Sequence, residues 1–99
     1  MSILHLVNKS PYDRNSLDTC VDFVRDGDAV LLIEDGVYAA IKGGAAAAKL
    51  QGLADVSVLG GDLAARGFAV DKLADGVKVV DYADFVDMVE AKDKVQSWL

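Results

Sequence analysis

Short apolar segments alternate along the chain with stretches in which apolar residues recur at helical spacing. Four segments rich in aliphatic residues predict β-strands, at residues 3–7, 29–33, 56–59 and 77–80. The second of them is apolar at every position, which is typical of a strand covered on both faces of a parallel sheet. The segments between the strands are long enough to hold a helical crossover each.

The first connecting segment predicts a helix with two alternative starts. Either Ser10 or Asn15 can act as the N-cap, because both side chains are able to accept a backbone N–H of the first turn. Gly27 is expected to end the helix. The apolar positions fall on one face at i, i+3, i+4 and i+7, and they are Leu17, Cys20, Val21 and Val24.

Glycines interrupt the second and third connecting segments. Residues 37–41 predict the start of a second helix, residues 42–44 break it, and residues 45–53 resume it with an alanine run of high helix propensity. In the third segment, Asp62 is the predicted cap of a short helix, and Gly67 is suited to its C-terminal end.

Asp81 is predicted to cap a last helix, and residues 95–99 are apolar enough to dock on the domain rather than extend into solvent. The resulting order, in which strands and helices alternate with short connections, is typical of α/β proteins. We therefore expect residues 1–99 to form a single α/β domain. Its sheet should be mostly parallel, with about four to five strands and helices on both faces.

The composition adds that the chain is unusually apolar for its size. Hydrophobic residues make up 53% of the 99 positions, glycine not counted, whereas ordinary soluble domains reach about 45–50% with glycine included. A domain this small keeps a large surface fraction, so some of this apolar area is expected to lie against partner subunits. The candidate contacts are Val37, Tyr38, Trp98 and Leu99; the alternative for Trp98 is that it folds back onto its own domain.

The charge distribution argues against direct contact with nucleic acid. The formal net charge is −6, and the ten Lys and Arg residues are scattered without a basic run, while phosphate binding needs a positive footprint. No apolar stretch approaches the roughly 18–20 residues of a membrane span. The first apolar segment is too short for a signal peptide and has no basic start. The expected location is therefore the cytoplasm.

The chain has one cysteine and one histidine, Cys20 and His5. As a thiolate, Cys20 could attack a persulfide or carry sulfur, but its helical spacing places it on an apolar face, which favours a small buried hydrophobe. His5 lies within an apolar strand, which favours a hydrogen-bonded core or interface histidine. The two residues are far apart in sequence and form no metal-ligand spacing.

The loops after the four strands are expected to share one edge of the sheet, where open α/β folds bind ligands. Three of these loops are acidic, and the sequence has neither a G-x-G-x-x-G motif nor a P-loop, so we predict no cofactor. The residues alone therefore favour an interaction or accessory role over a complete enzyme. The loop residues are Asn8, Lys9 and Ser10, then Glu34 and Asp35, then Gly60, Gly61 and Asp62, and last Asp81 and Tyr82.

Five segments, in the same order, make the chain similar to the TusB/DsrH family along nearly its whole length. Each segment alone is weakly specific, but their order across 99 residues is a specific signal. The segments are residues 1–5 with residues 8–11, then residues 34–40, 62–67, 80–86 and 95–99.

The resemblance implies a DsrE-like fold with flavodoxin-like layering and a cytoplasmic sulfurtransferase complex. It implies a heterohexamer with two copies each of this chain, a TusC/DsrF-like subunit and a TusD/DsrE-like subunit. The complex would pass persulfide sulfur to a TusE/DsrC-type carrier, for 2-thiolation of tRNA wobble uridine or for sulfur oxidation. The principal sulfur-carrying cysteine would belong to the TusD/DsrE-like subunit. Cys20 matches a cysteine of DsrH-type members, which makes it a candidate sulfur-handling thiol.

Two other functions remain as alternatives. One is a stand-alone α/β module that binds a small ligand and has no sulfur chemistry, which a tightly bound chromophore or nucleotide would favour. The other is a self-sufficient thiol enzyme built on Cys20, which a thiol pKa near or below neutrality would favour. The sequence does not choose between the tRNA and sulfur-oxidation branches.

Overall fold

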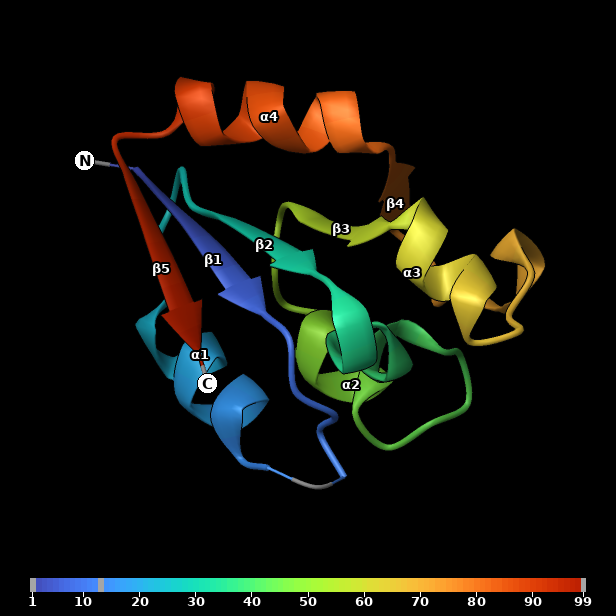
Figure 1. Ribbon diagram of the computed structural model, residues 1–99. Helices are drawn as coiled ribbons and strands as arrows, with labels where there is room; N and C mark the ends of the chain where they lie inside the picture. Colours follow the sequence, from blue (N-terminus) through green and yellow to red (C-terminus); the bar gives the residue numbers. More distant parts are fainter. Residues whose placement is uncertain (1, 13, 99) are drawn as a thin grey trace.

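The computed structural model describes residues 2–12 and 14–98, and its sheet has five strands in the order β4-β3-β2-β1-β5 (Figure 1). All four strand pairs are parallel. This arrangement confirms the predicted α/β class. The strands are β1 (Ile3–Val7), β2 (Ala29–Leu32), β3 (Val56–Leu59), β4 (Val77–Val80) and β5 (Lys94–Trp98).

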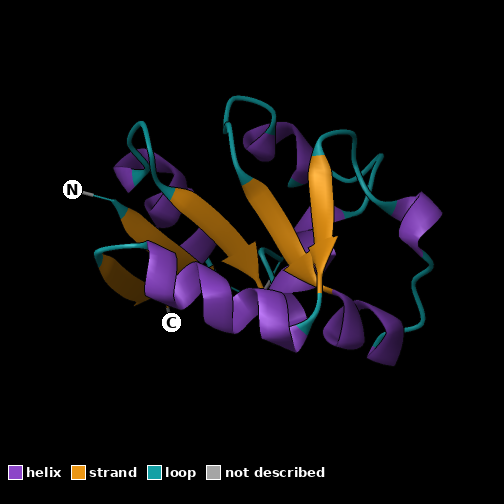
Figure 2. Cartoon of the chain, turned by 90° about the horizontal axis from the view of Figure 1, so that it is seen from above, coloured by secondary structure: helices purple, strands orange, loops and turns teal. Residues whose placement is uncertain are grey.

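Helices cover both faces of the sheet. The chain steps in one direction from β1 to β4, and α4 then carries it back across the sheet to β5, beside β1. Because crossovers between parallel strands are right-handed, this reversal places α4 on the opposite face from α1 and α2, as Figures 1 and 2 show. The helices are α1 (Ser16–Phe23), α2 (Ala47–Leu50), α3 (Gly60–Ala65) and α4 (Tyr82–Ala91), with 3₁₀ helices η1 (Glu34–Ala40) and η2 (Val70–Lys72).

The two faces of the sheet are buried to different depths. The larger core cluster lies on the face of α1 and α2 and includes Leu17, Val30 and Val58. The smaller cluster, under α4, has three buried residues, Leu4, Ala29 and Leu31, and Phe85 and Met88 of α4 pack against it. The residues of β2 are buried at all four positions, which explains why its sequence shows no polar alternation.

The structure corrects the second and third predicted helices. Residues 34–40 form a 3₁₀ helix rather than the start of an α-helix, and α2 is reduced to Ala47–Leu50. Asp62 is not a cap, because α3 begins at Gly60 and the Asp62 side chain instead accepts a hydrogen bond from the backbone N–H of Glu34. Gly67 follows this helix at φ +81°, as predicted for its C-terminal glycine.

The ends of α1 agree only in part with the sequence. The helix starts after Asn15, one of the two predicted positions, but the Asn15 side chain makes no capping hydrogen bond. The helix ends at Phe23, before the predicted stop at Gly27, so Val24 lies beyond its last turn.

Asp81 caps α4 in a reciprocal pair with Asp84: each side chain accepts the backbone N–H of the other residue. No helix within residues 2–12 and 14–98 has the length and apolar character that crossing a membrane would need.

Beyond α4, the chain docks on its own domain as a fifth strand. The expectation from sequence was docking of residues 95–99, without a specified conformation. In the structure, residues 94–98 pair along the whole of β1, from Ile3 beside Lys94 to Val7 beside Trp98. Strand β5 therefore forms an edge of the sheet, and β1 becomes an interior strand.

Candidate functional site

The single thiol of the chain lies in the core, not on the surface. Cys20 is 0% exposed and belongs to the same apolar cluster as Leu17 and Val30. Burial raises the pKa of the Cys20 thiol to about 12, and the negative charge of Asp28 adds to this effect. The thiol is therefore protonated at neutral pH, and as placed it is neither a nucleophile nor a metal ligand. The structure thus favours the structural role of Cys20 over a self-sufficient thiol enzyme.

Replacement of Cys20 by serine should preserve the fold and lower the free energy of unfolding by about 1–3 kcal/mol, because a hydroxyl is less tolerant of a dry apolar site than a thiol. Chemical denaturation of wild type and C20S would measure the loss. Cys20→Ala is the matched control, because it removes the sulfur without adding a hydroxyl. A C20S protein as stable as the wild type would mean that water or a polar partner reaches the thiol.

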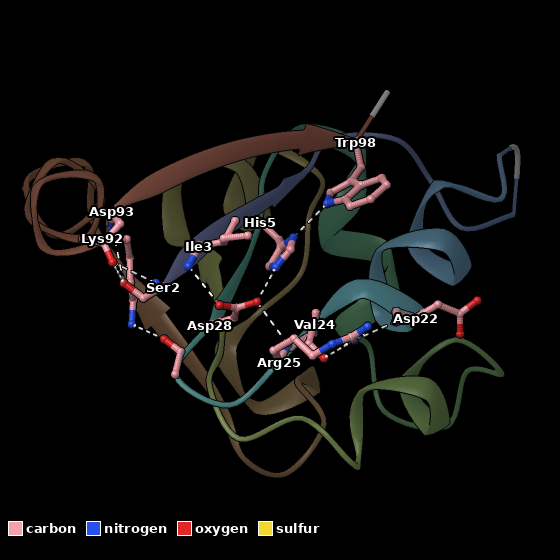
Figure 3. A network of polar contacts seen from close by, with 11 residues as sticks. Ser2, Ile3, His5, Asp22, Val24, Arg25, Asp28, Lys92, Asp93 and Trp98 are labelled. Carbon is pink, nitrogen blue, oxygen red and sulfur yellow. Dashed lines mark hydrogen bonds and ion pairs between the residues drawn. The ribbon is translucent and has the colours of Figure 1, made fainter.

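His5 is the buried, hydrogen-bonded histidine that the sequence predicts, and it joins three parts of the chain. Its Nε2 lies 2.9 Å from Oδ2 of Asp28, the residue before β2. Its Nδ1 lies 3.0 Å from the indole Nε1 of Trp98, at the end of β5. Figure 3 shows the imidazole held between these two side chains.

Sequence reasoning missed Asp28, which is the centre of this network. Its carboxylate accepts hydrogen bonds from His5 and from the backbone N–H groups of Ile3 and Arg25 (Figure 3). Burial opposes ionisation, but these three hydrogen bonds outweigh it, so the pKa of Asp28 lies below its ordinary value. The sequence signal for a buried Asp28 is its position directly before a run of five apolar residues, because the residue next to a buried strand lies close to the core.

At the other end of the strands, the structure brings three of the four predicted loops together. The side-chain amide of Asn8 donates to Glu34 at 3.3 Å, and the backbone N–H of Glu34 donates to Asp62 at 2.7 Å. Beside them, Asp35 forms an ion pair with Arg66 at 3.0 Å. Asp81, after the fourth strand, is engaged in capping α4. The carboxylates of Glu34, Asp62 and Asp35 are thus engaged by a side-chain amide, a backbone N–H and an arginine, and these contacts hold the loops in place.

Gly36 allows the loop after β2 to pack against the end of β1. A Cβ atom at this position would lie 2.1 Å from the carbonyl oxygen of Val7, far inside van der Waals contact. Glu34, two residues before Gly36, adopts a left-handed conformation with φ +49°. The Glu-Asp-Gly sequence at 34–36 therefore shapes the loop, and its acids need no ligand to explain them.

The four predicted partner contacts occupy different environments. Val37 is 0% exposed within the chain's own core, so its side chain has no surface for a partner to cover. Tyr38 is half-buried, with its ring edge-on to Phe68. Trp98 is half-buried and folds back onto its own domain, where it contacts His5 and Phe23. Leu99 lies outside the described residues.

Fold and site together define a small, all-parallel α/β domain whose only thiol is buried and protonated. Among the described residues, no three His, Cys, Asp or Glu side chains gather as metal ligands. Comparison with known proteins is consistent with this class. The ychN protein from E. coli, in its crystal structure, superposes with a TM-score of 0.81 over 98% of both chains, at 19% identity.

Within this class, the chain belongs to the DsrH family. The model of that family, described as "DsrH like protein", matches residues 9–95. Protein TusB of Pectobacterium parmentieri is 35% identical over 97 residues, which cover 97% of this chain and all of that protein. Protein TusB of Enterobacter sp. (strain 638) is also 35% identical over the same shares of both chains. The resemblance to the TusB/DsrH family found in the sequence is thereby confirmed.

Proposed function

We propose that this chain is an accessory subunit of a cytoplasmic sulfur-relay complex. In this proposal it assembles with TusC/DsrF-like and TusD/DsrE-like subunits into a heterohexamer with two copies of each. The complex passes persulfide sulfur to a TusE/DsrC-type carrier, for tRNA wobble uridine 2-thiolation or for sulfur oxidation. The observation that carries the proposal is the full-length similarity to proteins named TusB.

The environment of the thiol supports an accessory role rather than a catalytic one. A persulfide forms when a thiolate attacks a sulfur donor, and the buried Cys20 remains a thiol at neutral pH. In this proposal the sulfur-carrying cysteine belongs to the TusD/DsrE-like partner, as the family resemblance implies. Sulfur handling by Cys20 would require α1 to move away from the sheet so that the thiol becomes accessible.

The apolar surface supports the presence of partner subunits. Tyr82 is 70% exposed and Val86 is 43% exposed, both on α4, and Val95 of β5 is also exposed at 43%. We propose that partner subunits cover these side chains, because exposed large apolar side chains favour association. Tyr38, Trp98 and Leu99 remain proposed contacts from the sequence.

Co-expression tests the assembly. The chain should co-purify in equal amounts with the TusC/DsrF-like and TusD/DsrE-like proteins of its own source, and light scattering should give the mass of a heterohexamer. Val86→Glu should weaken this association by roughly tenfold or more, because it places a charge in the buried interface. Ala91→Glu is the matched control: it lies nine residues after Tyr82, two and a half turns on, and so on the opposite side of α4.

Mass spectrometry of the assembled complex tests the sulfur chemistry. Persulfide loading should appear on the TusD/DsrE-like subunit, and transfer to the carrier should continue in a complex that contains Cys20→Ala. Complete loss of transfer in that complex would contradict the accessory role. A chain that is a clean monomer, equally stable with and without its partners, would overturn the assembly.

A further inference from the structure

The hydrogen bonds around His5 assign its tautomer. The indole N–H of Trp98 is only a donor, so Nδ1 of His5, at 3.0 Å, must be the acceptor and carries no proton. The ionised Asp28 carboxylate is only an acceptor, so Nε2 of His5, at 2.9 Å, carries the proton. His5 is therefore neutral in this arrangement, and each of its ring nitrogens is satisfied.

A second proton on His5 is incompatible with the bond to Trp98. A proton taken from solvent onto Nδ1 turns this atom into a donor that faces another donor, the indole N–H. The side chain of His5 is 1% exposed, which leaves no other acceptor for the new N–H unless the indole moves. Because Trp98 is only half-buried, water can replace it once it has moved.

The geometry points to a proton-operated latch on the end of β5. With His5 neutral, Nδ1 holds the indole of Trp98 against β1; with His5 doubly protonated, the indole is released and the end of the edge strand is freed. The proton comes from solvent and returns to it, and the imidazolium stays paired with Asp28. This inference does not depend on the proposed sulfur relay.

Charged and titratable groups on each neighbouring element act on this equilibrium. Just before β2, the Asp28 carboxylate accepts from Nε2 of His5 whether or not Nδ1 is protonated, while the indole N–H faces Nδ1. From α1, Cys20 is a protonated thiol and adds no charge. The Arg25 guanidinium is turned to the carbonyls of Asp22 and Val24. From β5, strand alternation places Lys94 on the same face of the sheet as Trp98.

The latch acts on the last described residue of the outer strand of the sheet. Trp98 is the last described residue of β5, and its ring lies between His5, at a centroid distance of 6.0 Å, and Phe23, at 5.4 Å. The contact with Phe23 involves no titratable group and remains after protonation. Release therefore means rotation and hydration of the indole with fraying of the strand end, not unfolding of the sheet.

The chain contains one histidine and one tryptophan, so each side of the latch gives a single signal. The full chain with ¹⁵N-labelled His and Trp would be titrated with acid from neutral pH down to the onset of unfolding. The His5 resonances should first report the Nε2–H tautomer and then protonation. As His5 becomes protonated, exchange of the Trp98 indole proton should become roughly three- to tenfold faster, after correction for the pH dependence of exchange in free indole. This factor corresponds to the loss of one hydrogen bond.

Trp98→Phe tests the coupling from the other side. It keeps an aromatic ring against Phe23 but removes the N–H that competes with the proton on His5. The ratio of protonated to neutral His5 at a given pH should therefore rise roughly three- to tenfold. Phe23→Leu is the matched control, because it changes the opposite side of the indole and leaves the His5 bond in place. In this control the exchange of the indole proton and the His5 titration should remain coupled.

His5→Gln removes the titration and should make indole exchange independent of His protonation. If this variant fails to fold, the titration of Trp98→Phe still tests the latch. Unchanged His5 titration in Trp98→Phe would overturn the latch. Indole protection that is constant while His5 changes charge would also overturn it.

Discussion

Asp28→Ala is expected to lower the free energy of unfolding by about 3–5 kcal/mol, because it leaves three donors at this buried site unsatisfied, and this is a large part of the roughly 5–15 kcal/mol available to a domain. The Asp28 side chain is 1% exposed and accepts bonds from His5 and from the backbone N–H groups of Ile3 and Arg25. Alanine leaves all three donors without a partner in a dry site. Urea denaturation followed by circular dichroism would measure the loss.

Asp93→Ala is the matched control for this variant. Asp93 also accepts a backbone N–H, from Ser2 at 2.9 Å, but it lies at the surface, where water can replace the carboxylate. Its loss should therefore be much smaller than that of Asp28→Ala. Equal effects of the two substitutions would show that burial does not make the Asp28 network important.

The same carboxylate should make stability depend on acid pH. Because the pKa of Asp28 is lower in the folded chain than its ordinary value of about 3.9, folding favours the ionised form. Its contribution is present above the unfolded pKa and is lost as pH falls through the folded pKa. Below about pH 4, stability should therefore fall more steeply in the wild type than in Asp28→Ala. Parallel curves would contradict this assignment.

Gly36→Ala should be the other strongly destabilising change, by about 3 kcal/mol or more. The new Cβ would lie 2.1 Å from the backbone oxygen of Val7 and 2.8 Å from its carbonyl carbon. Backbone atoms at the end of an interior strand cannot rotate away as a side chain can, so the loop after β2 must shift. Thermal and urea denaturation would measure the loss.

Gly52→Ala is the control for replacing a glycine by alanine at a position where the added Cβ has free space. A Cβ atom at Gly52 would meet nothing within 4 Å. The change should be neutral or stabilising by about 0.4–1 kcal/mol, through the lower entropy of the unfolded chain. If the two variants had similar stability, the close approach of Gly36 to β1 would not be a real constraint.

The sequence predicted the elements that the core determines. Apolar runs identified four of the five strands, and helical spacing placed Cys20 on the buried face of α1. The predictions of β1, β2 and β3 succeeded because most residues of these runs are buried, whereas β4 is half-buried or exposed and was identified by its three valines. The helix predicted at residues 37–41 was wrong, because a contact between Gly36 and the distant Val7 shapes that segment, and local propensity contains no such contact.

The remaining strand and the His5 network depended on long-range pairing. Strand β5 is exposed along most of its length and contains the polar residues Lys94, Gln96 and Ser97. Its sequence is therefore not an apolar run and did not predict a strand. His5 was expected to be hydrogen-bonded, but its partners Asp28 and Trp98 lie 23 and 93 positions away in sequence. The sequence indicated that such partners exist, and only the folded chain identifies them.

The pairing of β1 with β5 has a consequence for synthesis on the ribosome. His5 and Trp98 are separated by 93 positions. At about 5–20 residues per second, the ribosome therefore completes β5 roughly 5–20 s after it has completed β1. Throughout that interval β1 has an open edge, although it becomes an interior strand of the finished sheet. The nascent chain thus presents an unpaired strand edge to chaperones or to other nascent chains, until its own last strand closes it.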